Sequence, residues 1–252
     1  MRVGGGEDDE GPPGVGGNPR GRALAALLLL VPIQSLAVIA LLFAFPGVEG
    51  KIFSGICRIW MLVLPLVWTR SVEGAPLDIR GPTRRGVGIG LAAGLALLAV
   101  ILATYALVRP ILDPGVLLAR ASSTGFDRPV SFVLVSAYVI FVNSLLEEYV
   151  WRWFVYRQVE AILPPGLGNA ARRAMAVLVA AMLFTVHHVI ALSAWVGPGA
   201  VLLGSVGVFL GALIWSAIYA RERSLWPCYF SHILADLAIM IIGYDVIFRS
   251  GG

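Results

Sequence analysis

Apolar runs about as long as a membrane is thick recur from one end of this chain to the other. The chain has 252 residues, of which 58% are hydrophobic and 13% are charged. About 20 apolar residues let a helix cross the hydrocarbon core of a bilayer. A soluble domain of this length would need far more polar surface. The sequence therefore predicts an all-α, polytopic bundle of about seven to eight transmembrane helices, and an integral membrane protein within the lipid bilayer.

Polar and Gly/Pro-rich segments divide the apolar sequence into seven spans. Residues 1–22 combine glycine, proline and acidic residues with nothing to bury, so we expect a disordered tail there. The remainder, 23–248, is the predicted membrane domain. Its spans are expected at 23–45, 52–68, 87–108, 129–162, 174–195, 200–220 and 225–247.

The basic residues lie mostly on one side of the predicted spans. One side collects Arg2, Arg20, Arg22, Arg70, Arg80, Arg84, Arg85, Arg152, Arg157, Arg172, Arg173, Arg221 and Arg223. The other side collects Lys51, Arg109, Arg120, Arg128 and Arg249. Because cytoplasmic loops carry the excess of Lys and Arg, the N-terminus is predicted to be cytoplasmic. No basic block with interleaved aromatic residues occurs, so nucleic acid is not an expected partner.

A few residues in or near the spans have simpler explanations. Arg58 lies within two turns of the start of its span, and we expect its side chain to reach the membrane interface. Cys57 and Cys228 show no metal or redox spacing, and the topology puts them near opposite faces. We expect both cysteines to be unpaired packing residues.

Several ionisable residues lie inside predicted spans, where bilayer or dry core would surround them. Glu147 and Glu148 interrupt span four, and all three histidines of the chain fall within spans. A charge inside a membrane is costly, and proteins that keep one usually use it. We therefore take Glu147, His188, His232 and Asp236 as candidate functional residues.

Helical spacing separates the roles of these residues. Glu148 and Arg152 are four apart and share a face, so they can form an ion pair. Glu147 is turned by about 100° from Glu148 and has no cation on its own face. It is therefore the carboxylate that is free to act as a base. His232 and Asp236 also share a face, so Asp236 could hold the His232 ring and fix its tautomer.

A carboxylate and two imidazoles on three helices form a hydrolytic set. Glu147 can take a proton from water, while His188 and His232 can donate hydrogen bonds to the oxyanion on a scissile carbonyl. The zincin motif HExxH is absent, because Val189 follows His188. A zinc site built from Glu147, His188 and His232 is nevertheless an open alternative.

Three short motifs also resemble those of a known family. EEYVWR, beginning at Glu147, resembles the EExxxR motif of the CAAX-protease and bacteriocin-processing (CPBP, or Abi) intramembrane proteases. FTVHH, beginning at Phe184, is similar to the FxxxH motif of that family. HILAD, beginning at His232, is similar to its third motif, a His followed four residues later by Asn or Asp. The resemblance covers about 132–241.

The resemblance implies an all-helical membrane fold with a catalytic cavity open to the cytoplasm. It implies that Glu147 activates water, that His188 and His232 position the water and stabilise the oxyanion, and that Glu148 and Arg152 support the site. The family has been described both as metalloproteases and as glutamate-type enzymes. Since Arg152 beside the pair would disfavour a cation, we expect a glutamic mechanism without a cofactor, with zinc as the alternative.

Asp236 and His187 each have an expected role of their own. Asp236 cannot donate a hydrogen bond to an oxyanion unless it is protonated, so we assign it to orienting His232. His187 is an additional histidine beside the motif residue, turned by about 100°, and we expect it to serve packing. Phe184 opens the second motif and is expected to support the site.

The leading hypothesis is an intramembrane endopeptidase. It would hydrolyse a peptide bond near the C-terminus or the membrane anchor of a membrane-attached protein. Removal of the last three residues after a prenylated cysteine, and processing of a sorting tail as in myxosortase systems, are both open. The short Gly/Pro/Arg-rich chain fits a prokaryotic inner or plasma membrane.

Two other classes of function, a scaffold and a transporter, compete with the protease. A non-catalytic scaffold or self-immunity protein of the same fold is the main alternative, although such a protein would be expected to lose a motif residue. A transporter that uses the buried acids for protons would show inverted halves, and we find no internal repeat.

Overall fold

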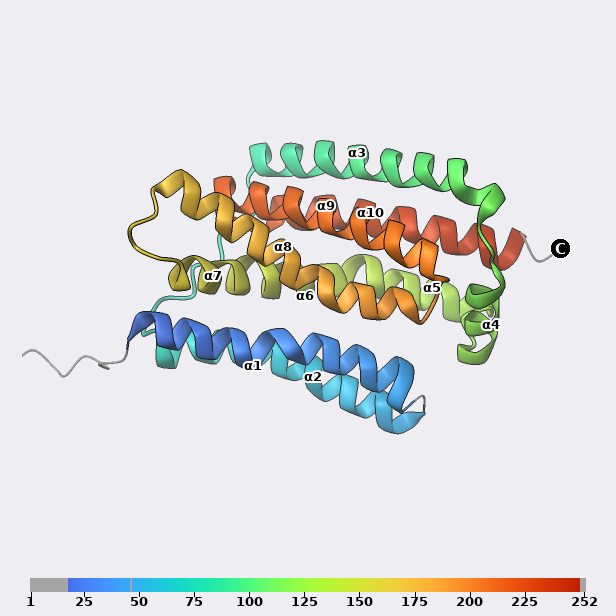
Figure 1. Cartoon of the computed structure of the whole chain (residues 1–252), viewed down its shortest axis with the longest axis horizontal. Helices are drawn as coiled ribbons and strands as arrows, with labels where there is room; N and C mark the ends of the chain where they lie inside the picture. Colours follow the sequence, from blue (N-terminus) through green and yellow to red (C-terminus); the bar gives the residue numbers. More distant parts are fainter. Residues whose placement is uncertain (1–17, 46, 250–252) are drawn as a thin grey trace, which may run out of the picture.

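The computed structural model describes residues 18–45 and 47–249, and within these ranges the chain is helical with no β-strand. Seven helices are long and apolar enough to cross a membrane, which confirms the predicted fold class and the integral membrane protein. They lie side by side with their axes roughly aligned (Figure 1). The seven spans are Pro19–Ala44, Val48–Val72, Arg84–Ile111, Pro129–Ile162, Asn169–Ser193, Pro198–Glu222 and Trp226–Arg249.

Most spans contain one α-helix, and several end in a π-helical turn. The helices are α1 (Pro19–Ile39), α2 (Val48–Val67), α3 (Arg84–Val108), α4 (Gly115–Thr124), α5 (Pro129–Ala137), α6 (Ser144–Glu148), α7 (Tyr156–Ile162), α8 (Asn169–Ser193), α9 (Pro198–Glu222) and α10 (Trp226–Tyr244). The short helix α4 connects α3 to α5 at one end of the bundle and does not span it (Figure 1).

Helix α1 begins at Pro19, earlier than the predicted boundary at residue 23. The side chain of Asn18 accepts a hydrogen bond from the backbone N–H of Arg20 at 3.1 Å. Proline follows at the first helical position, where its missing N–H costs nothing. The last residues of the predicted tail are therefore helical, and its residues 1–17 lie outside the described residues.

Span four is the only described span with two internal π-helical segments. Tyr138–Asn143 precedes α6, and Tyr149–Val155 follows it. A π-helical turn holds one more residue than an α-helical turn and is often found at functional sites. The two segments thus enclose Glu147 and Glu148 and rotate the faces of the span away from a simple α-helical register.

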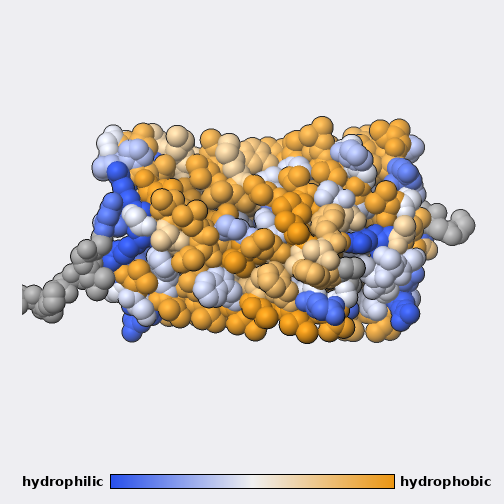
Figure 2. Space-filling view, turned by 60° about the horizontal axis from the view of Figure 1, so that its bottom comes forward, coloured by the Kyte–Doolittle hydropathy of each residue, from blue (hydrophilic) through white to orange (hydrophobic). Residues whose placement is uncertain are grey.

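An apolar belt surrounds the molecule. Hydrophobic residues cover the middle of the face in Figure 2, and hydrophilic residues gather at its two ends. Large apolar side chains in the spans are left exposed, and those of Leu107 and Ile111 are 81% and 83% exposed. Such a band matches the hydrocarbon layer, where lipid tails rather than protein cover the side chains.

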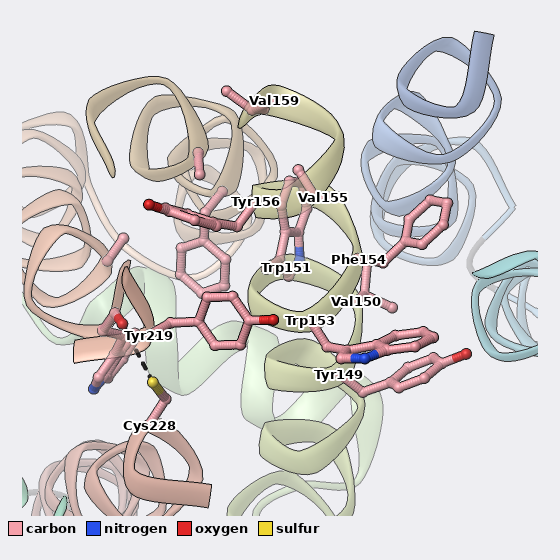
Figure 3. Packing of buried hydrophobic residues seen from close by; sticks show 14 of the residues in the cluster. Tyr149, Val150, Trp151, Trp153, Phe154, Val155, Tyr156, Val159, Tyr219 and Cys228 are labelled. Carbon is pink, nitrogen blue, oxygen red and sulfur yellow. Dashed lines mark hydrogen bonds between the residues drawn. The ribbon is translucent and has the colours of Figure 1, made fainter. Parts of the chain in front are cut away.

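The main core is built around the second half of span four. Its side chains point in several directions, Phe154 toward α1 and Tyr156 toward Tyr219 (Figure 3). Val150, Phe154 and Tyr156 are fully buried. The thiol of Cys228 donates to the backbone oxygen of Trp215 at 3.2 Å. The glutamate pair therefore lies at the edge of a dry, aromatic-rich core.

Helix α3 packs closely along α10, and glycines on α3 permit the approach (Figure 1). A Cβ at Gly90 would lie 2.4 Å from the backbone oxygen of Pro227. A Cβ at Gly94 would lie 2.9 Å from Cα of Ser231. Small residues allow such backbone contacts between membrane helices. This packing fixes α10, the helix that carries His232 and Asp236.

An ion pair fixes the end of span four against α9. Arg223 donates two hydrogen bonds to the Glu160 carboxylate, at 2.5 and 2.8 Å. These hydrogen bonds raise the pKa of Arg223 above its usual value. Arg223 has a φ of 49°, the left-handed conformation that ends a helix. The bidentate contact holds this residue where the chain turns from α9 to α10.

Candidate active site

Glu147 and Glu148 are buried as the apolar sequence around them predicted. Their exposed fractions are 3% and 0%, and Arg152 is also fully buried. A buried charge is tolerated only when it is paired and hydrogen-bonded. The partners of each carboxylate therefore decide what each can do.

Glu148 is held by an ion pair within its own helix. Nε of Arg152 donates to Oε2 of Glu148 at 3.1 Å, which confirms the predicted pair. Nη1 of Arg152 donates to the hydroxyl of Ser216 on α9 at 3.1 Å. The guanidinium also lies over the ring of Phe184, 4.9 Å from its centroid. Phe184 thus supports the site by covering the Arg152 side chain.

The second oxygen of Glu148 holds His232. Nδ1 of His232 lies 2.8 Å from Oε1 of Glu148, whereas Nε2 lies 3.7 Å from Oδ1 of Asp236. We expected Asp236 to hold this ring, but in the structure Glu148 makes the hydrogen bond. Asp236 instead accepts a hydrogen bond from Ser144 at 2.6 Å. A carboxylate next to Nδ1 makes that nitrogen the donor and directs Nε2 to the opposite side.

Glu147 differs from Glu148 because no arginine or lysine among the described residues pairs with it. Its Oε1 accepts a hydrogen bond from Nδ2 of Asn143 at 2.9 Å. Its Oε2 lies 3.9 Å from Nε2 of His188 and 3.8 Å from Nε2 of His232. These separations are too long for direct hydrogen bonds and suit one bridging water. Three spans thus bring Glu147, His188 and His232 together.

His188 presents one fixed nitrogen to Glu147. Its Nδ1 lies 3.2 Å from the backbone oxygen of Phe184, one helical turn earlier. Since a carbonyl oxygen only accepts, Nδ1 carries the proton in this contact. Nε2 then faces Glu147 with a lone pair when the ring is neutral, and in that form it cannot donate to an oxyanion, the role expected for His188 from the sequence. His188 is the most exposed of the three histidines, with 24% of its side chain accessible.

His187 was expected to serve packing, and its ring does pack. It stacks on Trp151 with centroids 5.3 Å apart and planes 9° apart. The same ring also faces the site, since its Nε2 lies 3.8 Å from Oε1 of Glu147. Sequence spacing missed this second role because the direction of a neighbouring helix decides which of two adjacent residues faces it.

Asn143, Ser144 and Ser216 were also missed by the sequence reasoning. Asn143 lies four residues before Glu147, so helical spacing alone would have found it. Ser216 lies near the middle of an apolar span, where a hydroxyl needs a partner. Ser144 offered a weaker signal, because a serine in a helix often bonds the preceding turn, as it does here with Ile140 at 2.8 Å.

The donor set also fits a zinc ion. Ligand atoms of Glu147, His187 and His188 all lie within 4.8 Å of one another. The zinc alternative from the sequence named His232 with Glu147 and His188, so this group differs from it by one histidine. Such a set would hold Zn²⁺ through two imidazole nitrogens and a carboxylate. When bound, the ion would supply Lewis-acid polarisation of a carbonyl.

Three residues outside this centre can be compared with their expected roles. Arg58 was expected to reach the interface, and its guanidinium lies over the ring of Tyr138, 5.5 Å from the centroid. Cys57 and Cys228 are buried and unpaired, which confirms the prediction that they form no disulfide.

An apolar cavity of about 600 Å³ lies between the first half of span four and α10. Ser136 and Ile140 line it from span four, and Ile233 and Leu237 line it from α10. Asp236 lies between Ile233 and Leu237 in the sequence. The cavity therefore opens along the helix that carries Asp236 and does not enclose the glutamate pair.

The comparison with protein families identifies this region of the chain. Residues 129–238 match the family described as type II CAAX prenyl endopeptidase, Rce1-like. The match includes every predicted site residue from Glu147 to Asp236 and confirms the resemblance stated above. No curated protein and no solved structure matches the chain.

Proposed function

We propose, from the premise that residues 129–238 belong to the Rce1-like family of CAAX protease-type enzymes, that this chain is a glutamate-dependent intramembrane endopeptidase. It hydrolyses a peptide bond near the C-terminus or the membrane anchor of a membrane-attached protein. The observation that carries the proposal is the position of the Glu147 carboxylate, with imidazole nitrogens 3.8 and 3.9 Å from one oxygen and no guanidinium from the described part of the chain bonded to it.

The first step uses Glu147 as a general base. A water molecule that donates to Oε2 of Glu147 also lies within reach of Nε2 of His188, whose lone pair accepts a hydrogen bond from the second O–H of the water. Glu147 takes the first proton, and the water oxygen attacks the scissile carbonyl carbon. Asn143 donates to the other carboxylate oxygen and so holds the base in place.

The oxyanion that forms on the scissile carbonyl needs a hydrogen-bond donor. Nδ1 of His232 is committed to Glu148, so its Nε2 donates when the ring carries both protons. The C–N bond then breaks, and the leaving amine takes the proton from the Glu147 carboxylic acid. Glu148 and Arg152 act through His232 by fixing its ring, so both are positioning residues.

The family match favours a substrate whose lipid anchor lies in the bilayer beside the scissile bond. A prenylated C-terminus and a C-terminal sorting tail both have this form. The predicted cytoplasmic N-terminus puts the glutamate pair toward the cytoplasmic end of span four. The enzyme would then act on proteins anchored at the cytoplasmic face of a prokaryotic plasma membrane.

A non-catalytic scaffold or immunity protein of the same fold is the second candidate. Its support is the deep burial of Glu148 and Arg152, which would also be explained by a purely structural ion pair. Glu147 favours the enzyme, because a scaffold has no use for a buried carboxylate among three imidazoles.

The test compares the C-termini of membrane proteins in cells with the wild type or Glu147→Gln. The amide keeps the shape and the Asn143 contact but cannot accept a proton, so substrates should accumulate uncleaved. Glu49→Gln, at an exposed position at the start of α2, is the matched control and should process normally. If no protein accumulates uncleaved in Glu147→Gln, the chain is not a glutamate-dependent protease.

A further inference from the structure

The His187 side chain is unusual for a buried residue. It is 3% exposed, and neither ring nitrogen has a hydrogen-bond partner among the residues that the structure describes. Leaving a buried polar group without a hydrogen bond destabilises the folded protein. Folded proteins rarely accept that cost without a reason. Packing alone would be served equally well by phenylalanine at this position.

Nε2 of His187 lies near the carboxylate of Glu147, and Nε2 of His188 lies near the same carboxylate. Nε2 of His187 is 3.8 Å from Oε1 of Glu147, and Nε2 of His188 is 3.9 Å from Oε2. Zinc bonds of about 2.0–2.1 Å in tetrahedral geometry put neighbouring ligand atoms roughly 3.4 Å apart. The ligand atoms of the three residues lie within 4.8 Å of one another, so binding the ion would draw the most distant pair together by at most about 1.4 Å.

The groups behind these ligands are those of a metal site. Metal-binding histidines usually donate the second ring N–H to a carbonyl or carboxylate, and ligating carboxylates are themselves hydrogen-bonded. Nδ1 of His188 meets the backbone oxygen of Phe184 at 3.2 Å, and Asn143 donates to Glu147 at 2.9 Å. Trp151 stacks on His187 and fixes the plane of its ring.

We propose that Glu147, His187 and His188 form an inhibitory site for a divalent transition metal such as Zn²⁺. The inhibition rests on the proposed function, because the metal would occupy the carboxylate that otherwise accepts a proton from water. His187 takes no part in the catalytic step and serves as the additional ligand. Imidazole and carboxylate donors in a site open on one side suit zinc better than magnesium or calcium, which prefer oxygen alone.

His187→Phe tests the site directly. Phenylalanine keeps an aromatic ring against Trp151 and removes both nitrogens. Binding of ZnCl₂ to the purified full chain in lipid nanodiscs is measured by calorimetry, so the readout does not depend on activity. The wild type should bind one ion, and the variant should bind it at least tenfold more weakly. Cys57→Ala is the matched control, because it removes a buried thiol elsewhere and should leave binding unchanged.

Inhibition is measured separately, with each variant compared to its own zinc-free rate. Zinc should inhibit the wild type, and His187→Phe should need at least tenfold more zinc for the same inhibition. Equal zinc affinity in both proteins, or no binding to the wild type, overturns the site. Activity that rises with zinc overturns the inhibitory role. Zinc binding that depends on His187 in a protein with no peptidase activity keeps the site and removes the proposed function.

Discussion

The ion pair between Glu148 and Arg152 offers the sharpest test of the forces inside span four. Both side chains are fully buried, and the N–O distance is 3.1 Å. Arg152→Met removes the cation while keeping much of the side-chain volume. Breaking a buried pair by removing one partner costs about 3–5 kcal/mol, because the remaining charge is left without compensation. That cost corresponds to about two to three and a half orders of magnitude in the unfolding equilibrium.

A second substitution separates the charge from the shape. Glu148→Gln/Arg152→Met removes both charges of the pair, and the side-chain carbonyl of the introduced glutamine can still accept from Nδ1 of His232. Replacing a buried pair as a whole is often nearly neutral. The double variant should therefore recover most of the stability that Arg152→Met loses.

Reversible unfolding in mixed micelles measures the free energy of each variant. Arg85→Met is the control, since it breaks an exposed ion pair with Glu222 in which the Arg85 side chain is 81% exposed. Such pairs contribute about 0–1 kcal/mol. A loss below about 1 kcal/mol in Arg152→Met, or a double variant less stable than the single one, would refute the reasoning.

Three further outcomes are expected. Gly90→Ala puts a methyl group against the Pro227 backbone and should destabilise the protein by about 1–3 kcal/mol, whereas Gly88→Ala meets no atom within 4 Å and should be tolerated. Equal unfolding free energies of the two would contradict the close α3–α10 contact. Asp236→Asn keeps an acceptor for Ser144 and should hydrolyse a membrane-anchored peptide faster than Asp236→Ala. If the two variants have equal free energies of unfolding, this difference in rate cannot come from a cavity in the alanine variant. Arg84→Cys should react with impermeant thiol reagents only from the cytoplasm and Arg120→Cys only from outside; the opposite result would reverse the orientation.

The length of the apolar runs predicted the seven spans. Helical spacing predicted contacts within one helix, such as the Glu148–Arg152 pair, because both residues lie on one face. The same rule would have found Asn143 beside Glu147.

Contacts between helices were beyond that rule. Asp236 shares a face with His232, yet Glu148 on span four reaches that ring first, at 2.8 Å. His187 lies about 100° from His188, yet both rings approach Glu147. Each outcome depends on how two spans are rotated against each other. The π-helical turns of span four change that rotation, and nothing in the apolar sequence predicts them.

Those π-helical turns also constrain how the gene can change. A π turn is equivalent to one residue inserted into an α-helix. Deleting one residue from Tyr138–Asn143 would restore regular α-helical hydrogen bonding and leave the two halves of the span facing as they do, whereas deleting one from α6 would turn them by about 100° against each other. Single-residue deletions should therefore be tolerated in the loop before α5 and between Tyr138 and Val142, and eliminated by selection within α6.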